Sequence, residues 1–318
     1  MADDLTTLAD LVKINDNNLA DIDGVSDLLN KAPLIGSLAA DESSNGTTHK
    51  YLKETGAPVV GFRAPNEGRD HDKSTDEVVT TDLKVLDASF SVDVTIPDGY
   101  AKGPDVWLGR EGKRHLREAY FVAEKQFING QGDGQATGFV GMADVLNDLA
   151  IETVTGAGGA ANLSSIYFIR TNNDGTDVMA IGGGQEIGAG VDIMWREPVI
   201  TSKTDGTGKT FPAYLVPITA WLGLQVGGKY SMGRLCNIPA GVGGDTAGAV
   251  TDALIYSALE QMPFDPDLIV MNRRSRRQLR ESRTATNATG APAPRPTEVE
   301  GIPILKVESI TNAETAVA

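Results

Sequence analysis

Polar and apolar residues alternate most clearly between residues 85 and 97. Every second position there is apolar: Leu86, Ala88, Phe90, Val92, Val94 and Ile96. This period of two is typical of a strand with one buried face. The phase shifts at Val85, where two apolar residues are adjacent, and the shift predicts a bulge or bend.

Upstream of this strand, residues 61–75 (GFRAPNEGRDHDKST) are highly polar and begin with a glycine. This segment is too polar to pack on its own chain, so we predict a projecting two-stranded hairpin over residues 49–96 with the polar segment at its tip. An isolated hairpin is only marginally stable in water. The prediction therefore implies that the hairpin lies against another surface.

A helical period replaces the alternation after residue 105. Apolar residues recur at a spacing of about 3.6 positions, at Leu116, Tyr120, Ala123 and Phe127. We predict a helix over residues 105–129, stopped by Gly130 and roughly 35 Å long at about 1.5 Å per residue. On its surface, Arg114 and Glu118 have the spacing of an ion pair.

Strand patterns dominate residues 165–238, in runs at 166–169, 178–181, 191–195, 213–216, 221–226 and 232–238. A helix with an apolar stripe from Leu254 to Met262 follows, then the apolar strand 268–271 and a helix over 273–283 capped by Asn272.

At the other end, residues 4–31 alternate apolar patches with acidic residues. They predict two short helices on an acidic arm.

The stretch KTDGTGKT (residues 203–210) ends like a phosphate-binding P-loop, but Lys203 stands where that motif needs its first glycine. A P-loop also opens a helix, whereas two prolines follow here. We interpret the stretch as the turn of a hairpin between residues 191–195 and 214–216. The glycine groups at 130–134 and 182–188 lack the strand-then-helix context of a dinucleotide site.

The net charge of the chain argues against one class of function, the binding of nucleic acid. The 318 residues carry 28 basic and 43 acidic side chains, a net charge of −15, and such a surface repels nucleic-acid phosphate. Six arginines cluster on the helix over 273–283 without interleaved aromatic residues. We interpret that face as solvated or as a subunit contact rather than as a nucleic-acid site.

Candidate chemistry is sparse. The single cysteine, Cys236, excludes an internal disulfide framework, and the three histidines (His49, His71 and His115) are interpreted as solvated. Known catalytic and metal-binding motifs are absent from the sequence, so we predict neither an enzyme nor a cofactor or metal site. No apolar window is long enough to span a membrane. The arm, the hairpin and the long helix are instead surfaces that a monomer does not use.

Taken in order, five stretches resemble the major capsid proteins of tailed bacteriophages that have the Hong Kong 97 coat fold. They are GAPVVGFRAPNEG (56–68) for the extended loop, GREGKRHLREAYFVAEKQFING (109–130) for the spine helix, AWLGLQVGGKYSMGRLCNI (220–238) for peripheral strands, PDLIVMNRRSRRQLRESR (266–283) for an axial-domain strand and helix, and EGIPILKVESITNAE (300–314) for the tail. The resemblance covers nearly the whole chain and implies an α+β fold.

The resemblance also implies a division into domains. The expected parts are an N-terminal arm (1–48), an extended loop with the first peripheral strand (49–100), the spine helix (101–131), a first axial part (132–215), peripheral strands (216–240) and a second axial part (241–318). Contacts between subunits are expected at seven residues: Phe62, Arg63, Glu67, Arg114, Arg117, Arg273 and Arg277.

The implied function is that of a coat protein of the virion, assembled in the host cytoplasm into pentamers and hexamers of an icosahedral shell around double-stranded DNA. The expected partners are copies of the chain itself, a separate scaffolding protein, a portal and a decoration protein, with packaged DNA close by but bound without sequence preference and no membrane. Two alternatives stay open: an encapsulin-like compartment shell, and an unrelated enzyme that uses the glycine loops near residues 130–160 or 182–190.

Overall fold

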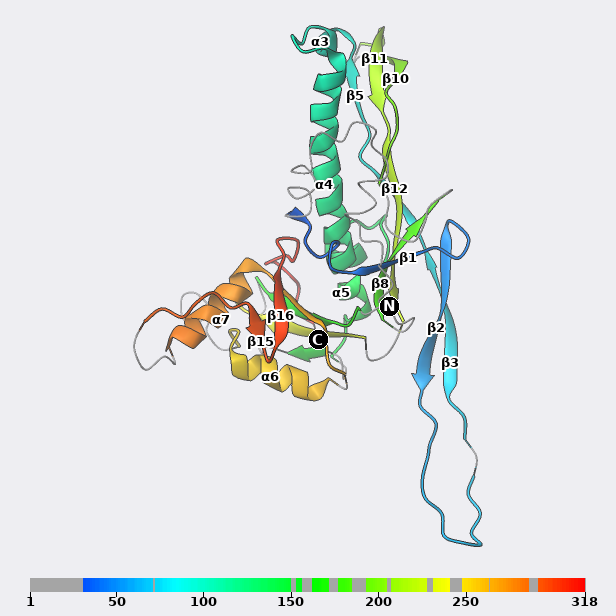
Figure 1. The fold of residues 1–318 in the computed structure, drawn as a ribbon, viewed down its shortest axis with the longest axis vertical. Helices are drawn as coiled ribbons and strands as arrows, with labels where there is room; N and C mark the ends of the chain where they lie inside the picture. Colours follow the sequence, from blue (N-terminus) through cyan, green and yellow to red (C-terminus); the bar gives the residue numbers. More distant parts are fainter. Residues whose placement is uncertain are drawn as a thin grey trace, which may run out of the picture.

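The computed structural model describes residues 31–70, 72–149, 153–155, 162–171, 177–184, 193–204, 207–227, 231–240, 248–262, 264–285 and 291–317. The arm predicted over residues 4–31 lies outside these residues except for Lys31. Three parts are visible: an upright column of one long helix beside strands, a compact lobe at its foot, and a hairpin that projects away from both (Figure 1).

The described helices are α3 (Thr95–Asp98), α4 (Pro104–Asp133), α5 (Met142–Val145), α6 (Asp252–Gln261) and α7 (Arg273–Ala285). The described strands are β1 (Ala39–Glu42), β2 (Thr48–Gly56), β3 (Thr75–Asp82), β4 (Lys84–Asp87), β5 (Phe90–Asp93), β6 (Thr153–Thr155), β7 (Ser164–Ile169), β8 (Val178–Gly183), β9 (Met194–Trp195), β10 (Val199–Thr204), β11 (Thr210–Val216), β12 (Ile218–Val226), β13 (Met232–Ile238), β14 (Leu268–Met271), β15 (Glu298–Val299) and β16 (Ile302–Lys306).

The long helix α4, called the spine helix below, contains the helix predicted from the apolar stripe. Pro104 occupies its first turn, where a missing N–H costs nothing. Gly130 has a φ of 62° and kinks the helix near its end, close to the stop predicted from the sequence. Gly112 lets the helix approach β9, because a Cβ there would lie 2.3 Å from the Trp195 ring.

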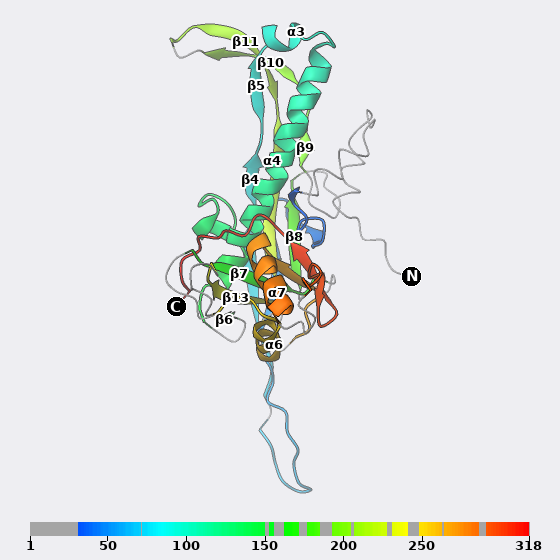
Figure 2. The same cartoon turned by 90° about the vertical axis from the view of Figure 1, so that its left-hand side faces the viewer.

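Two sheets accompany the spine helix. The first has the order β1-β8-β12-β4, with β9 pairing to β12, and the second has the order β10-β11-β5. The second lies at the far end of the column, where the β10–β11 hairpin bends away from the long axis (Figure 2). The apolar side of the spine helix and the first sheet share one core with residues 32–38.

The compact lobe is built on a sheet with the order β15-β16-β14-β7-β13-β6, with α6 and α7 packed on it. Strands β7 and β14 are buried along their whole length, as expected for central strands covered on both faces. The sheets join segments across two of the expected domain boundaries: β10 and β11 stand beside the spine helix, whereas β13 belongs to the lobe.

The alternating stretch 86–96 does not form one strand, contrary to our prediction. It divides into β4 and β5, and the Asp93 carboxylate ends β5 by accepting hydrogen bonds from the Thr95 N–H (2.9 Å) and hydroxyl (2.8 Å). These two bonds lower the pKa of Asp93. The short helix α3 begins at Thr95, so Ile96 belongs to a helix rather than to a strand.

The hairpin interpretation of KTDGTGKT is confirmed for the turn and corrected for one strand. Residues 199–204 pair with residues 210–216 in antiparallel register, and Gly208 has a φ of 84° in the turn between them. The segment 194–195, which we had placed in this hairpin, pairs with β12 instead. No helix within the described residues is long and apolar enough to cross a membrane.

Candidate assembly surfaces

The projecting hairpin, residues 48–82, is called the extended hairpin, and His49 anchors its base. The His49 ring is buried, its Nε2 lies 2.6 Å from Oε1 of Gln225 on β12, and it stacks on Tyr51. The prediction of a solvated histidine is therefore wrong for His49. It is also wrong for His115, which stacks on Phe90 and lies 3.1 Å from the Ala88 carbonyl oxygen. His71 lies outside the described residues.

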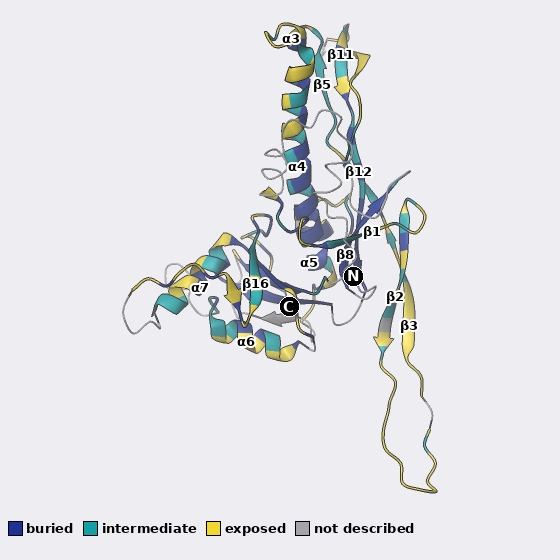
Figure 3. Cartoon of the chain, viewed as in Figure 1, coloured by how far each residue is buried: buried dark blue, intermediate teal, exposed yellow. Residues whose placement is uncertain are grey.

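Beyond its base, the extended hairpin exposes apolar side chains that no other described part of the chain covers. Leu52 and Val78 are directly opposite each other in the β2–β3 register and are 61% and 63% exposed. At the tip, Val59 and Val60 are also exposed, and Phe62 is as exposed as it is in an extended peptide. Figure 3 shows this exposure along the whole lower half of the hairpin.

Arginine side chains give the tip its shape. Arg69 donates hydrogen bonds to the backbone carbonyls of Gly61 (2.9 Å) and Val59 (2.6 Å), across the two arms of the tip. Arg63 donates to the Glu67 carbonyl at 3.0 Å. The predicted contact residues Phe62, Arg63 and Glu67 thus lie together. Sequence reasoning missed Arg69, because nothing in the local pattern shows that its side chain bridges the tip.

The spine helix carries two further predicted contact residues, Arg114 and Arg117. Arg114 pairs with Glu111 at 2.9 Å rather than with Glu118, contrary to the prediction. Glu118 instead pairs with Lys31 at 3.4 Å, because Lys31 lies against this face of the helix. Arg117 is half-buried on the same helix. Both predicted arginines are far along the chain from the tip of the extended hairpin.

Helix α7 places its arginines differently from our interpretation of a solvated or subunit-contact face. Four of them hold neighbouring segments of the same chain: Arg274 donates to Ile238 O (3.1 Å), Arg276 to Pro296 O (3.0 Å), Arg280 to Ala293 O (2.7 Å) and Arg283 to both Asp252 oxygens (2.8 and 2.7 Å). Arg273 and Arg277, the two residues predicted as contacts, are exposed. Arg277 lies 3.6 Å from Glu281.

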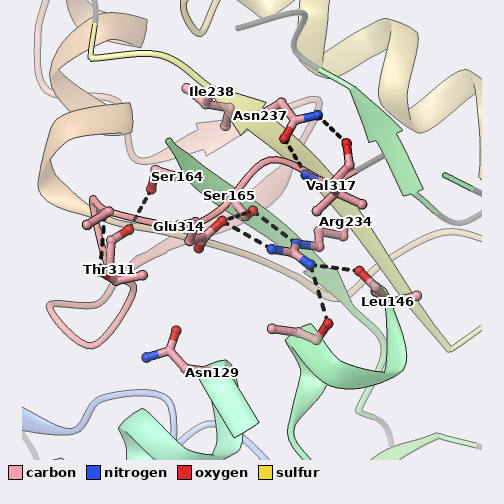
Figure 4. Close-up of polar contacts among 12 residues, drawn as sticks. Asn129, Leu146, Ser164, Ser165, Arg234, Asn237, Ile238, Thr311, Glu314 and Val317 are labelled. Carbon is pink, nitrogen blue, oxygen red and sulfur yellow. Dashed lines mark hydrogen bonds and ion pairs between the residues drawn. The ribbon is translucent and has the colours of Figure 1, made fainter. Parts of the chain in front are cut away.

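A buried polar cluster fixes the last residues of the chain, which we call the C-terminal strap (residues 307–317). Arg234 on β13 donates to Ser165 Oγ (3.0 Å), to Leu146 O (2.7 Å) and to the Glu314 carboxylate of the strap (3.1 Å), as Figure 4 shows. The side chains of Arg234 and Glu314 are only 5% and 3% exposed. Sequence reasoning did not find this pair, which is 80 residues apart.

The electrostatics of this cluster are those of a structural tie. Burial alone would lower the pKa of Arg234, but Tyr167 and Glu314 outweigh it and raise the pKa. Burial also raises the pKa of the nearby Cys236 thiol, which makes the thiolate needed for reaction scarce. Two hydrogen bonds of 2.9 Å between Asn237 and the Val317 backbone extend the tie to the end of the strap.

Groups suited to chemistry are few. The described residues hold no cluster of three or more histidine, cysteine, aspartate or glutamate side chains placed to bind a metal ion. A cleft of about 390 Å³ opens between the extended hairpin and the end of the spine helix. It is lined mainly by apolar and threonine side chains, among them Phe139, Val145 and Leu224. The exposed apolar side chains of the extended hairpin are suited to contact with other chains.

Comparisons with known proteins agree with this conclusion. The family described as Major capsid protein GP7 matches residues 17–318. A solved structure of bacteriophage Epsilon15 is 20% identical, covers 87% of this chain and 88% of its own, and superposes with a TM-score of 0.60. The bacteriophage JBD30 capsid is 12% identical over 84% of this chain and 87% of its own, with a TM-score of 0.47. The comparison with curated proteins gives no match.

The family match covers almost the whole chain, and the Epsilon15 structure shares its fold, so the Hong Kong 97-like coat fold expected from the sequence is confirmed. The function expected from the sequence, that of a structural capsid component rather than an enzyme, is confirmed with it. The chain therefore belongs to the Major capsid protein GP7 family and is a self-assembling component of a phage capsid.

Proposed function

We propose that the chain forms hexamers and pentamers of an icosahedral shell around double-stranded DNA, and that the extended hairpin of each copy lies on a neighbouring copy. One observation carries the second part: among the described residues, nine of the fifteen exposed large apolar side chains lie on the extended hairpin or at the far end of the column. They are Leu52, Val59, Val60, Phe62 and Val78 on the extended hairpin, and Ile96, Val106, Val199 and Ile200 at the far end of the column.

The physical reason is the cost of leaving this surface in water. Fully burying a Val, Leu or Phe side chain is worth about 1.5–3 kcal/mol, and a two-stranded hairpin has little stability of its own. A neighbouring copy can supply the missing surface for Leu52, Val78 and Phe62. Because the hairpin of one copy then contacts a different surface of the next, the contact is heterologous, and such contacts close into rings when the rotation permits.

The sheets support a division into domains that differs from the expected one. In this proposal, strands β8 to β12 belong with the spine helix to a peripheral domain, and residues 232–238 belong to an axial domain made of the compact lobe. Helix α7 lies on the lobe with Arg273 and Arg277 exposed. We propose that these two arginines contact neighbouring copies around the axis of a capsomer, while Arg114 and Arg117 contact the hairpin of a neighbour.

Further partners follow from the charge of the chain and from the shell it builds. A net charge of −15 disfavours tight binding to phosphate, so packaged DNA can move within the shell. A separate scaffolding protein, a portal and a decoration protein complete the proposed set. These partners are proposed because a closed shell of one protein needs an entry for DNA and control over its curvature.

The test is the size of the assemblies that the purified chain forms at low and moderate salt, measured by sedimentation and negative-stain microscopy. We expect capsomer rings or closed shells roughly tens of nanometres across, held together by contacts of about standard interface size or larger. A monomer or dimer under every condition, including added crowding agent and co-expressed scaffolding protein, would contradict the proposal.

A further inference from the structure

A buried carboxylate joins three segments that are far apart in the sequence. Glu124 lies in the middle of the spine helix and is 0% exposed. Its Oε2 accepts a hydrogen bond from the Leu34 N–H at 2.7 Å, and its Oε1 contacts the hydroxyl of Ser309 in the C-terminal strap. A second bond ties the same two elements, from Asn129 Nδ2 to the Ser309 carbonyl oxygen at 3.0 Å.

The hydrogen-bond partners of the Glu124 carboxylate are neutral. The charged side chains of the adjoining segments are engaged with one another: Lys31 pairs with Glu118, and Lys306 pairs with Glu308 at 2.8 Å. Lys125, the next residue on the helix, is exposed. The surroundings of the carboxylate are apolar, since Leu34, Ile35, Ala123, Phe127 and Ile128 belong to one buried cluster.

This setting favours the neutral acid. Burial raises the pKa of Glu124 from 4.5 to about 7, although hydrogen bonds from Ser309, Leu34 and Ile35 act in the opposite direction. A carboxylate without a partner charge is costly to bury. Protonated Glu124 can donate its O–H to Ser309 Oγ while Oε2 still accepts from Leu34, so all three segments stay joined.

We propose that Glu124 is a proton-sensitive latch: the neutral acid holds residues 32–38 and the C-terminal strap against the spine helix, and the ionised form loosens residues 32–38. The latch therefore controls how firmly residues 32–38 and the strap are held to the spine helix. This role goes beyond shell formation and does not depend on how copies are arranged.

The direction of the effect follows from linkage. The pKa of Glu124 is higher in the folded chain than in the unfolded chain, so the favourable contribution of the latch is complete below pH 4.5 and is lost as the pH rises towards 7. Above that pH, hydration of the carboxylate requires residues 32–38 to separate from the helix. Residues that lie on α6 and α7 have no part in this junction.

The test is hydrogen exchange of full-length chains in assembled particles, measured by mass spectrometry at pH 5.5 and pH 8.5 and corrected for the intrinsic rate at each pH. We expect residues 32–38 of the wild type to lose protection by at least about tenfold at the higher pH, a change of about 1.4 kcal/mol in opening free energy. Glu124→Gln, a neutral isostere of the protonated acid, should keep full protection at both values.

The matched control is Glu118→Gln, which removes a carboxylate of the same helix that contacts the same N-terminal segment but is 61% exposed. It should leave the pH response of residues 32–38 intact. Equal protection of the wild type at both pH values, or an unchanged pH response in Glu124→Gln, would overturn the proposal.

A second measurement covers the case in which Glu124→Gln does not assemble. Infrared difference spectroscopy of wild-type particles detects the carbonyl band of a buried protonated carboxyl directly. The band should disappear between about pH 6 and 8, a span of one unit on each side of the value for Glu124. Its absence at pH 5.5 in wild-type particles would also overturn the proposal.

Discussion

The C-terminal strap and the extended hairpin use polar and apolar residues in opposite ways. At the strap, Glu314 and its partner Arg234 on β13 are polar side chains that are buried and bonded within one chain. In the hairpin, apolar side chains such as Val60 and Phe62 are exposed, 83% and 109% respectively. Both are departures from the usual rule that apolar residues lie inside and charged residues outside.

The difference separates residues that stabilise the subunit from exposed residues that we propose to contact another copy. Within the same chain, the Glu314 carboxylate of the strap is paired with Arg234 and bonded by the Ser165 hydroxyl, and this pairing makes its burial tolerable. The tip of the hairpin has polar bonds that fix its backbone, through Arg69 and Arg63, whereas its apolar side chains are exposed. Substitutions in the strap should therefore affect folding, and substitutions in the hairpin should affect assembly.

The largest effect is expected from Arg234→Ala. This change leaves the Glu314 carboxylate buried without its guanidinium partner and removes the bond to the Leu146 carbonyl. Breaking one side of a buried ion pair costs about 3–5 kcal/mol. Urea unfolding of the unassembled subunit measures the loss. The exposed Arg273→Ala is the control, and an Arg234→Ala subunit as stable as this control would show that the strap is not a structural tie.

The next effect is a dependence of subunit stability on pH. The raised pKa of Glu124, about 7 against 4.5, implies that stability falls as the pH rises between these values, by up to about 3 kcal/mol at about 1.4 kcal/mol per pKa unit. Urea unfolding at pH 5 and pH 8 measures this difference. In Glu124→Gln the contribution should vanish, and a variant that retains the full pH dependence would assign it to other groups.

Phe62→Ser is expected to have a smaller effect, which is measured on assembly rather than on unfolding of the subunit. The side chain is fully exposed among the described residues, so subunit stability should change by less than about 0.5 kcal/mol. Assembly should weaken, because a Phe buried against another copy contributes about 1.5–3 kcal/mol per contact. Light scattering gives the concentration at which shells form. An unchanged concentration would mean that the tip stays in water.

The smallest effect is expected from Arg277→Ala. Its ion pair with Glu281 is 3.6 Å long and its members are 46% and 60% exposed, and exposed pairs of this kind contribute less than about 1 kcal/mol. Subunit unfolding should be almost unchanged. If the arginine contacts a neighbouring copy as proposed, the assembly concentration should rise slightly, whereas Arg280→Ala, which loses its bond to Ala293, should destabilise the subunit itself.

Local periodicity was sufficient to predict the elements whose pattern of apolar residues stays the same along their length. The apolar stripe gave the spine helix, and four consecutive apolar residues gave β14 at residues 268–271, as observed. The polar tip between two strand patterns predicted the extended hairpin, but the predicted range 49–96 was too long: the hairpin ends at Asp82, and β4 and β5 pair with β12 and β11 instead. The stretch 86–96 misled because its alternation continues through Asp93, whose side chain turns the backbone by bonding Thr95.

Contacts between distant segments left no such pattern. In the sequence, Arg234 and Glu314 look like any other charged residues, and they pair only because the fold brings β13 and the strap together. Glu124 likewise resembles any surface residue of a helix. The spacing of arginines on α7 indicates a polar face, but it does not show that the segments at Ala293 and Pro296 cover that face. Burial of polar groups is decided by tertiary packing, which a single sequence does not display.

The most direct test of the central claim, that the hairpin tip is covered by another copy, is thiol labelling of Phe62→Cys. The natural Cys236 is buried, so a maleimide probe reports the new thiol. We predict rapid labelling of unassembled subunits and labelling at least about tenfold slower in assembled shells, the difference expected for about 1.4 kcal/mol or more of protection. Equal labelling rates in subunits and shells would contradict the account.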